Sequence, residues 1–542
     1  MTHPNVSTAL AFTVIDELAR NGVRLVVLSP GSRSAAMAIA ANEHPDVVAR
    51  VVIDERSAAF HALGAAKGSG RPVAVLSTSG TATANFFPAV VEADMSCAPL
   101  VVLTADRPVE LRGVGANQTI DQIELYGSKV RHFAAIEAPS ALSDLNRTWR
   151  ETVTACLAAA TVGRPGPVHI NIAFREPTVP VTDDGRSSGD VYPYPTGRLE
   201  FDLRPQVGAN GDMPVIEGSR VLVVAGDGEY DRGRLLSQAH GRNWPVLATA
   251  LSEMRGMDVV TTYHHLMSGL PDHLRPEAVL AVGSIGPSSR LEDLVDLAAE
   301  RVRVDRWGRS IDPHGSATHR LSADINEVLS NQVTQADAGW LENWREADRS
   351  RRARLSVDLR ASGRLSCGLI ASLLNDVAWE TLVVGSSLPI REVDAHLTRA
   401  GRVLANRGAS GIDGLVSTAL GVASQGRATV AFAGDLSLLH DSNGFLGEVE
   451  ADICFVIADN DGGGLFDDLP LAVHAPDYVR LFVTPHGRDL GKLAAFHGVG
   501  YTEAGDADEL AGNVRACVES GGIHIVRVPI ERSADREVRA QL

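Results

Sequence analysis

The feature that most constrains the fold of this chain is a repeated alternation between short apolar runs and longer helix-like segments. Each run consists of a few β-branched or aliphatic residues and lacks a polar face. Strands buried on both faces have this composition, and they occur in parallel sheets that helices cover on both sides. In the first third of the chain we expect such strands at Arg24–Leu28, Val48–Ile53, Val73–Ser77, Leu100–Thr104 and Gly166–Ile172.

The same alternation recurs twice more along the 542 residues. The sequence therefore predicts an α/β protein of three doubly wound domains with mainly parallel sheets, over residues 1–180, 198–335 and 350–542. Phe174–Gly197, rich in Pro, Asp, Ser and Gly, is expected to be a linker, and Asp337–Leu359 a charged helix. The second and third sets of strands are expected at Arg220–Val224, Pro245–Thr249, Ala278–Val282 and Val302–Val304, then at Leu382–Gly385, Val403–Ala405, Thr429–Ala433, Ile453–Ala458 and Ile523–Val528.

The first helix is expected over Thr8–Asn21, with Ser7 as its N-cap and Gly22 as its stop. Nothing in this N-terminal stretch resembles a secretory signal, and no run of 18 apolar residues predicts a membrane span. The five cysteines are scattered without a Cys-x-x-Cys pair, which favours a reducing cytoplasm over a disulfide framework. The formal net charge of −17 argues against general nucleic-acid binding.

Polar and glycine residues follow two neighbouring predicted strands of the third domain. One strand runs into Gly434-Asp435-Leu436-Ser437, and the next ends in Asp459-Asn460-Asp461-Gly462. In parallel sheets, ligands bind beyond the carboxyl ends of the strands. A carboxylate, an amide oxygen and a backbone carbonyl suit Mg²⁺, and glycine lets a diphosphate approach the backbone. On these residues alone, a metal–diphosphate site and a pair of tight turns remain equally good interpretations.

A second candidate lies in the first domain, where the strand Val48–Ile53 ends in Asp54-Glu55-Arg56 before a helix expected at Ser57–Lys67. An acid in this place is commonly a helix cap, favoured by the helix dipole. The alternative is a functional carboxylate at a strand end.

Several motifs together resemble the 2-succinyl-5-enolpyruvyl-6-hydroxy-3-cyclohexene-1-carboxylate synthase family of thiamine-diphosphate-dependent enzymes. The resemblance covers the whole chain and is strongest in the first 120 residues and in residues 385–466. The most specific stretch is Asn406-Arg407-Gly-Ala-Ser-Gly411-Ile412-Asp413-Gly414. The others are Ser29-Pro-Gly-Ser-Arg33-Ser, Asp54-Glu55-Arg56, Ser79-Gly80-Thr81, Thr104-Ala-Asp-Arg107-Pro108, Gly115-Ala-Asn117-Gln118, Gly434-Asp435-Leu436-Ser437 and Gly462-Gly463.

The resemblance implies the thiamine-diphosphate enzyme fold and a catalytic Glu55 that hydrogen-bonds the aminopyrimidine of the cofactor. Mg²⁺, or Mn²⁺, would be bound by Asp435, Asn460 and Gly462, although the Asp-Asn-Asp stretch allows a register one residue away. Cofactor-binding residues would be Glu55, Ile412, Gly434, Asp435, Leu436, Ser437, Asn460, Gly462, Leu465 and Phe466. For Ile412, Leu465 and Phe466, core packing is the alternative and is compatible with this role.

The implied reaction belongs to menaquinone biosynthesis: 2-oxoglutarate is decarboxylated and the resulting acyl group is added to isochorismate. Both substrates are dianions, and the guanidinium of arginine pairs with carboxylates in a bidentate way. Four arginines follow predicted strand ends, where a surface or ion-pair role is the alternative. The implied substrate-binding residues are Arg33, Arg107, Asn117, Gln118, Ser387, Arg391 and Arg407. Asn117 and Gln118 could instead belong to a polar loop, and Ser387 could be a helix N-cap.

In this family the catalytic glutamate and the metal motif of one site come from different subunits, which implies a homodimer or a tetramer of paired dimers. Some relatives carry a substrate-binding lysine in the middle domain, where this chain has Ser288-Ser289-Arg290. Another thiamine-diphosphate enzyme, either a 2-oxo acid decarboxylase or an acetolactate-synthase-like carboligase, is the alternative function. A catalytically inactive relative is a third possibility, although Glu55, Asp435 and Asn460 are all present.

Overall fold

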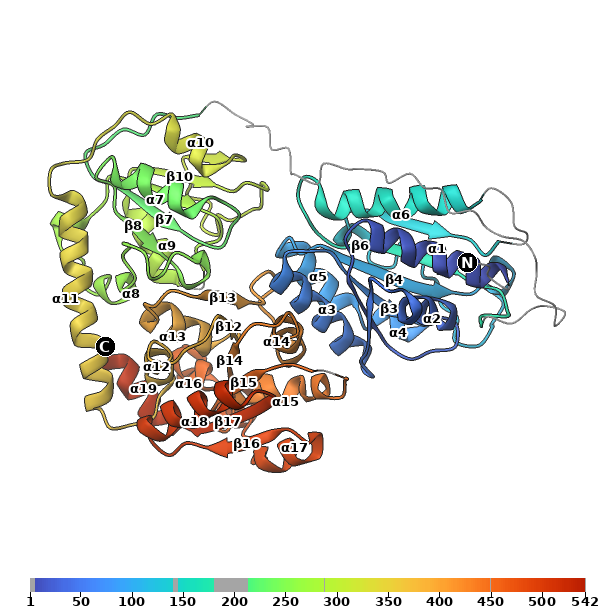
Figure 1. The fold of residues 1–542 in the computed structure, drawn as a ribbon. Helices are drawn as coiled ribbons and strands as arrows, with labels where there is room; N and C mark the ends of the chain where they lie inside the picture. Colours follow the sequence, from blue (N-terminus) through green and yellow to red (C-terminus); the bar gives the residue numbers. More distant parts are fainter. Residues whose placement is uncertain (1–4, 140–144, 180–212, 287, 449, 542) are drawn as a thin grey trace. The chain divides into compact units, whose positions relative to one another are not determined.

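Within the residues that the structure describes, the chain forms three separate β-sheets, and every strand pair in them is parallel (Figure 1). The structure is a computed structural model that describes residues 5–139, 145–179, 213–286, 288–448 and 450–541. Helices pack against these sheets, so the predicted α/β class with doubly wound parallel sheets is confirmed. Residues 180–197 of the predicted linker lie outside the described residues.

The first sheet has the strand order β2-β1-β3-β4-β6-β5. Alternate side chains of β1, such as Val26 and Val27, enter two different hydrophobic clusters, because successive residues of a strand point to opposite faces. Residues of α1, α2 and α6 belong to one cluster and residues of α3 and α5 to the other, so both faces are covered. The strands are β1 (Leu25–Leu28), β2 (Val48–Val51), β3 (Val73–Ser77), β4 (Leu100–Asp106), β5 (Phe133–Ile136) and β6 (Val168–Ala173). The helices are α1 (Val6–Arg20), α2 (Ala35–Glu43), α3 (Glu55–Ser69), α4 (Thr81–Ala84), α5 (Phe87–Met95) and α6 (Leu145–Thr161), with short turns η1 (Val109–Leu111) and η2 (Gly127–Lys129).

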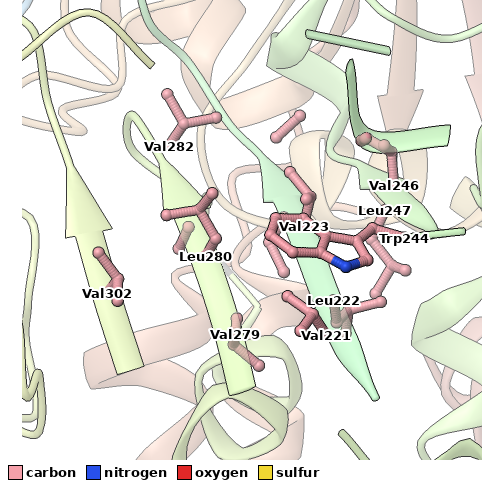
Figure 2. Close-up of a cluster of buried hydrophobic side chains, with 14 of the residues drawn as sticks. Val221, Leu222, Val223, Trp244, Val246, Leu247, Val279, Leu280, Val282 and Val302 are labelled. Carbon is pink, nitrogen blue, oxygen red and sulfur yellow. The ribbon is translucent and has the colours of Figure 1, made fainter. Parts of the chain in front are cut away.

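The second sheet has the order β11-β10-β9-β7-β8. Figure 2 shows its core, in which the Trp244 ring lies among aliphatic side chains of β7, β8 and β9. The strands are β7 (Val221–Ala225), β8 (Val246–Ala248), β9 (Ala278–Val282), β10 (Glu300–Val304) and β11 (His319–Leu321). The helices are α7 (Arg232–His240), α8 (Tyr263–Leu266), α9 (Ser289–Leu297), α10 (Ile325–Ser330) and α11 (Trp340–Ala361), with η3 (Ala250–Ser252) and η4 (Asp272–Leu274).

The third sheet has the order β13-β12-β14-β15-β17-β16. The long helix α11 joins its core to that of the second sheet, because Trp340 packs in one and Leu359 in the other. The strands are β12 (Thr381–Val384), β13 (Arg402–Ala405), β14 (Thr429–Gly434), β15 (Ile453–Asp459), β16 (Gly500–Glu503) and β17 (Ile523–Pro529). The helices are α12 (Cys367–Leu373), α13 (Leu388–His396), α14 (Leu415–Ala423), α15 (Asp435–His440), α16 (Leu471–His474), α17 (Leu490–His497), α18 (Ala507–Ser520) and α19 (Arg532–Gln541), with η5 (Ser442–Phe445), η6 (Gly464–Asp468) and η7 (Val479–Val483). None of the helices in the described part of the chain is long and apolar enough to cross a membrane.

Two local predictions about helix starts were wrong. Asn5, not Ser7, caps α1, since the Asn5 side chain accepts a hydrogen bond from the Thr8 amide at 2.9 Å. Helix α3 begins at Glu55, two residues earlier than expected. The sequence also failed to predict three strands, β5, β11 and β16, each of which lies at an edge of its sheet. The other three edge strands, β2, β8 and β13, were predicted. Those that were missed are short and only partly buried, and polar residues interrupt β11 and β16.

The chain divides into two compact units. The first unit comprises Met1–Gln206, Asn406–Arg427 and Ser437–Ala451, and the second comprises Val207–Ala405, Ala428–Leu436 and Asp452–Leu542. Two short segments from late in the chain, including α14 and η5, therefore belong with the first sheet. The domain limits 1–180, 198–335 and 350–542 stay a prediction.

Glycines bring α3 and α14 of the first unit into close contact. A Cβ at Gly64 would lie 2.1 Å from the carbonyl oxygen of Thr418, and a Cβ at Gly421 would lie 2.1 Å from that of His61. These distances are too short for any side chain, so the two backbones must touch. Small residues at the crossing point are what permits this approach.

We expect Gly64→Ala to lower the midpoint of chemical denaturation, because the added methyl group meets backbone that cannot rotate away. Overpacking of this kind costs about 1–3 kcal/mol. Gly512→Ala is the matched control, since its Cβ would meet nothing within 4 Å in the exposed face of α18. At position 512, alanine should raise the free energy of unfolding by about 0.5–1 kcal/mol. Equal midpoints for the two variants would contradict the close helix contact.

Candidate functional site

Glu55 is the first residue of α3 and is half-buried. The helix cap is its neighbour Asp54, whose side chain accepts a hydrogen bond from the Ser57 amide at 3.2 Å. The side-chain amide of Asn443 donates a second hydrogen bond, 2.8 Å long, to the Asp54 carboxylate. Asp54 therefore performs the capping that the sequence alone offered as an alternative role for Glu55.

The start of α3 is fixed by contacts with residues far along the chain in the same unit. Arg56 donates a 2.8 Å hydrogen bond to the carbonyl of His440, and Ser57 donates one of 3.3 Å to Asp441. The fully buried Asp441 also accepts a bond from the Ser417 amide at 2.7 Å. Burial raises the pKa of Asp441 to about 6. This set of bonds fixes the helix turn that carries Glu55.

Arg33 and Arg107 form a pair of buried cations beyond the ends of β1 and β4. Arg33 donates to the carbonyl of Phe174 at 3.0 Å and pairs with Glu176 at 3.3 Å. Burial lowers the pKa of the Arg107 guanidinium, and the charge of Arg33 lowers it further. Two guanidinium groups that repel each other in a partly desolvated place favour a ligand with negative charge.

Ser79 joins Arg107 to the loop that carries Asn117 and Gln118. Arg107 donates one hydrogen bond to the Ser79 hydroxyl and another, 2.9 Å long, to the carbonyl of Asn117. The Ser79 hydroxyl donates to the Gln118 carbonyl at 3.0 Å, and the Gln118 side chain donates to the Ser79 carbonyl at 3.1 Å. The structure thus brings Arg107, Asn117 and Gln118 together, with Arg33 next to them. Both Asn117 and Gln118 remain exposed.

Ser387 and Arg391 lie together at the first turn of α13, in the second unit. Ser387 occupies the N-cap position, but its hydroxyl makes no capping hydrogen bond, so capping does not account for this side chain. Arg391 donates a 2.6 Å bond to the Ser387 carbonyl, and burial lowers the pKa of Arg391. In the first unit, the half-buried Arg407 lies in the loop that follows β13.

Left-handed backbone recurs in these loops. Non-glycine residues with positive φ include Gln118 (54°), Ser387 (78°), Ser410 (64°) and Asp461 (55°). Such conformations cost energy for side chains other than glycine and concentrate at functional sites. Gln118, Ser410 and Asp461 lie in motifs quoted above, and Ser387 is one of the implied substrate-binding residues.

A group of possible metal ligands lies beyond the ends of β14 and β15. Ligand atoms of Asp435, Asp459 and His486 all fall within 4.8 Å of one another. His486 Nε2 is 3.1 Å from Asp435 Oδ2 and 3.8 Å from Asp459 Oδ1. Both carboxylates are buried, and burial raises the pKa of Asp435 to about 6. Asp459 also pairs with the Arg527 guanidinium at 2.6 Å, and a metal cation between Asp435 and Asp459 would compensate more of the buried negative charge.

The glycines around this group differ in the space beside them, and only Gly434 among the three leaves room for an approaching ligand. The Gly462 amide donates to Asp435 at 2.8 Å, and a Cβ at Gly462 (φ 130°) would lie 2.1 Å from the Val483 carbonyl. At Gly434, in contrast, a Cβ would meet nothing within 4 Å. Asn460 lies over Gly464, where a Cβ would come within 2.4 Å of its side-chain nitrogen. Metal binding by Asn460 and Gly462 stays a prediction.

His486 was not among the predicted ligands, and Asp459 entered only through the alternative register one residue away from Asn460. Asp459 lay inside the quoted motif, whereas His486 lies 51 residues beyond Asp435 and has no motif of its own. Only the fold brings it to the metal group.

The remaining predicted residues are distributed over both units. Leu465 packs against the core of the third sheet, and the Phe466 ring lies 6.0 Å from that of Phe482. Ile412 is 36% exposed in the first unit, an exposure that leaves it available to a ligand. Leu436 is half-buried and Ser437 is buried. In the middle region, Arg290 donates to the Ser268 hydroxyl at 3.1 Å.

Comparisons with known proteins give one consistent result. The model of the thiamine pyrophosphate enzyme N-terminal TPP binding domain matches residues 8–125. A 2-succinyl-5-enolpyruvyl-6-hydroxy-3-cyclohexene-1-carboxylate synthase of Thermobifida fusca is 40% identical over 99% of this chain and 98% of its own. Enzymes of the same name from Chloroflexus aurantiacus and Rubrobacter xylanophilus are each 38% identical over 98% of this chain, and over 94% and 96% of their own.

Proposed function

The chain belongs to the 2-succinyl-5-enolpyruvyl-6-hydroxy-3-cyclohexene-1-carboxylate synthase family of thiamine-diphosphate-dependent enzymes, and from this premise we propose how its own residues carry out the reaction. In menaquinone biosynthesis, 2-oxoglutarate loses CO₂ and its remaining four-carbon acyl group is added to isochorismate. The observation that carries the proposal is the match along nearly the whole chain, with every quoted motif present.

The donor set supports binding of thiamine diphosphate through Mg²⁺ or Mn²⁺. Buried carboxylate oxygens suit a hard divalent cation, and the open space at Gly434 leaves the backbone accessible to a diphosphate. Asp435, Asn460 and Gly462 would hold the metal, with Asp459 and His486 beside them. Leu436, Ser437, Leu465 and Phe466 would border the cofactor. When bound, the cofactor supplies the carbon nucleophile and stabilises the negative charge left by loss of CO₂.

Glu55 would hold a proton against a ring nitrogen of the aminopyrimidine. This role needs a carboxyl group that helix capping does not occupy, and Asp54 provides the cap instead. The bonds of Arg56 and Ser57 to the segment around Asp441 keep this turn in place. Ile412 would support the cofactor ring through apolar contact.

Arg33, Arg107, Arg391 and Arg407 would bind the carboxylates of the two substrates. The charge of Arg33 lowers the pKa of Arg107, so a dianion bound beside the two guanidinium groups would relieve their repulsion. Asn117 and Gln118 would donate hydrogen bonds to substrate oxygens from the adjoining loop. Ser387, Arg391 and Arg407 would bind the second set of carboxylate or carbonyl oxygens.

A second copy of the chain completes the proposed enzyme. The family resemblance supports a homodimer, or a pair of dimers, in which Glu55 of one copy serves the metal residues of the other. Free cysteines at all five positions fit a reducing cytoplasm. Sedimentation velocity would establish the oligomeric state.

A coupled assay tests the function. We expect product only when thiamine diphosphate, a divalent metal, 2-oxoglutarate and isochorismate are all present. Turnover of pyruvate alone would instead favour the alternative, a 2-oxo acid decarboxylase or an acetolactate-synthase-like carboligase, whose smaller substrates do not need this many pocket arginines.

We expect Arg107→Ala to raise the Michaelis constant for isochorismate by about one to two orders of magnitude. The reason is the loss of a charge-assisted pair, which contributes roughly 1.5–3 kcal/mol. Arg107→Lys should recover only part of this, because lysine keeps the charge without the planar fork. Steady-state kinetics with saturating cofactor provide the measurement, with the exposed Arg147→Ala as control. A wild-type constant in Arg107→Ala would remove this residue from the substrate pocket.

A further inference from the structure

The loop that carries Arg407 is held by a buried ion pair that none of the motifs includes. Glu92 of α5 and Lys67 of α3 lie 2.8 Å apart, and their side chains are only 3% and 10% exposed. Lys67 is one of only three lysines in the chain. Nearly all basic residues of this chain are arginines, so a lysine in a buried ion pair needs a specific structural explanation.

Glu92 binds the backbone directly after Arg407. One carboxylate oxygen accepts the amide of Gly408 at 3.0 Å, as well as the Lys67 ammonium, and the other accepts the amide of Ala409 at 2.6 Å. Hydrogen bonds to an ionised carboxylate are about twice as strong as neutral ones. Two such bonds in succession fix the position of the peptide that follows Arg407.

Lys67 holds the residue directly before Arg407. Its ammonium donates to the side-chain oxygen of Asn406 at 3.2 Å, and the Asn406 amide donates to the Thr418 hydroxyl of α14 at 2.9 Å. The backbone on both sides of Arg407 is therefore tied to the same ion pair. Asn406 is buried, so these bonds form out of reach of water.

The shape of the loop leaves no space for an alternative arrangement at Gly408. A Cβ there would lie 2.9 Å from the Glu92 carbonyl, 2.9 Å from the Met95 Cβ and 2.9 Å from the Ser96 amide. The loop therefore rests on the end of α5 by backbone contact. Lys67 also lies on the same rigid helix as Glu55, so one helix carries the proposed catalytic acid and part of the support for Arg407.

We propose that Glu92 and Lys67 are positioning residues for Arg407, and that they set the affinity of the enzyme for its dicarboxylate substrates. This inference rests on the proposed function, because it takes Arg407 as a substrate-binding residue. The ion pair itself would touch neither substrate nor cofactor. Its action would pass entirely through the loop from Asn406 to Ala409.

Glu92→Gln is the first test. The glutamine amide would place an N–H donor against either the Gly408 or the Ala409 amide, so one bond is lost and two donors face each other. We expect the Michaelis constant for 2-oxoglutarate to rise about tenfold to a hundredfold, since small misplacements of a binding group have effects of this size. Hydrogen–deuterium exchange at the thiazolium carbon of the bound cofactor should keep its wild-type rate. Lys67→Met should act in the same direction, and Lys67→Arg should recover part of the affinity.

A double variant separates positioning from a general loss of stability. If Glu92 acts through Arg407, Glu92→Gln combined with Arg407→Ala should bind substrate no worse than Arg407→Ala alone. Glu17→Gln is the matched control, because Glu17 is a buried carboxylate of the same unit that pairs with Arg150. It should lower the denaturation midpoint without changing either Michaelis constant. Where Glu92→Gln does not fold, the Lys67 variants carry the same comparison.

The outcomes distinguish this inference from the proposed function. A raised constant in Arg407→Ala with a normal one in both Glu92→Gln and Lys67→Met would overturn the inference alone. Fully additive losses in the double variant would also overturn it. A normal constant in Arg407→Ala would overturn the substrate role of Arg407, and the positioning role with it.

Discussion

Replacement of Glu55 by glutamine is expected to slow proton exchange at the thiazolium carbon of bound cofactor by about 10²–10⁴-fold, the usual contribution of a positioned acid or base. Glutamine preserves the size of the side chain and one hydrogen bond, but it cannot share a proton with the ring nitrogen. Product formation in the coupled assay should fall by at least the same factor. The exchange rate is measured by quenching the enzyme–cofactor complex in D₂O at successive times.

The fold should survive this change, because Asp54 rather than Glu55 caps α3. Glu43→Gln, an exposed substitution at the end of α2, is the matched control and should exchange at the wild-type rate. A wild-type exchange rate in Glu55→Gln would exclude Glu55 from activation of the cofactor, whatever its effect on later steps.

The second large effect is expected for Asp435→Ala, which should weaken binding of the divalent metal by at least about 10²-fold. Changes to residues that only orient metal ligands already cost 10–100-fold, and Asp435 is proposed as a ligand itself. Cofactor affinity at limiting Mg²⁺ should fall in parallel, since the diphosphate would lose its bridging cation. Calorimetric titration of metal and cofactor provides both values.

An exposed acid of the second unit, Asp508, gives the control for this titration. Asp508→Ala should bind both ligands normally. If Asp435→Ala keeps its cofactor affinity at limiting Mg²⁺, the metal site lies elsewhere.

The buried position of Asp435 also predicts how metal binding depends on pH. Burial raises its pKa to about 6, so in the metal-free protein the carboxyl group is protonated below that pH and ionised above it. Because the metal binds the ionised form, its affinity should be constant above about pH 7 and should fall as the pH drops through 6, by up to about tenfold per unit. Titrations between pH 5 and pH 8 measure this, and an affinity that is flat down to pH 5 would contradict it.

The central strands could be predicted from the sequence because the information lies within each strand. A strand buried on both faces has to be apolar throughout, and β3 and β9 coincide with their predicted limits, Val73–Ser77 and Ala278–Val282. Asp435 and Glu55 could be found in the same way, since each lies two residues beyond the end of a predicted strand. The edge strands β11 and β16 escaped prediction because partial exposure allows polar residues within them, whereas the edge strands β2, β8 and β13 were predicted.

Other features of the candidate site arise only from tertiary structure. His486 contacts Asp435 although 51 positions separate them in the sequence. Glu92 contacts the loop after Arg407 although more than 300 positions separate them. No local pattern marks such residues, because a buried polar side chain is defined by its partner and the partner is supplied by chain topology. The sequence by itself thus determined the sheets and the residues at their carboxyl ends. The tertiary structure decided which distant side chains form hydrogen bonds and ion pairs with those residues. An unpaired buried charge is costly, so a buried charged side chain is found with a partner that the fold brings close to it.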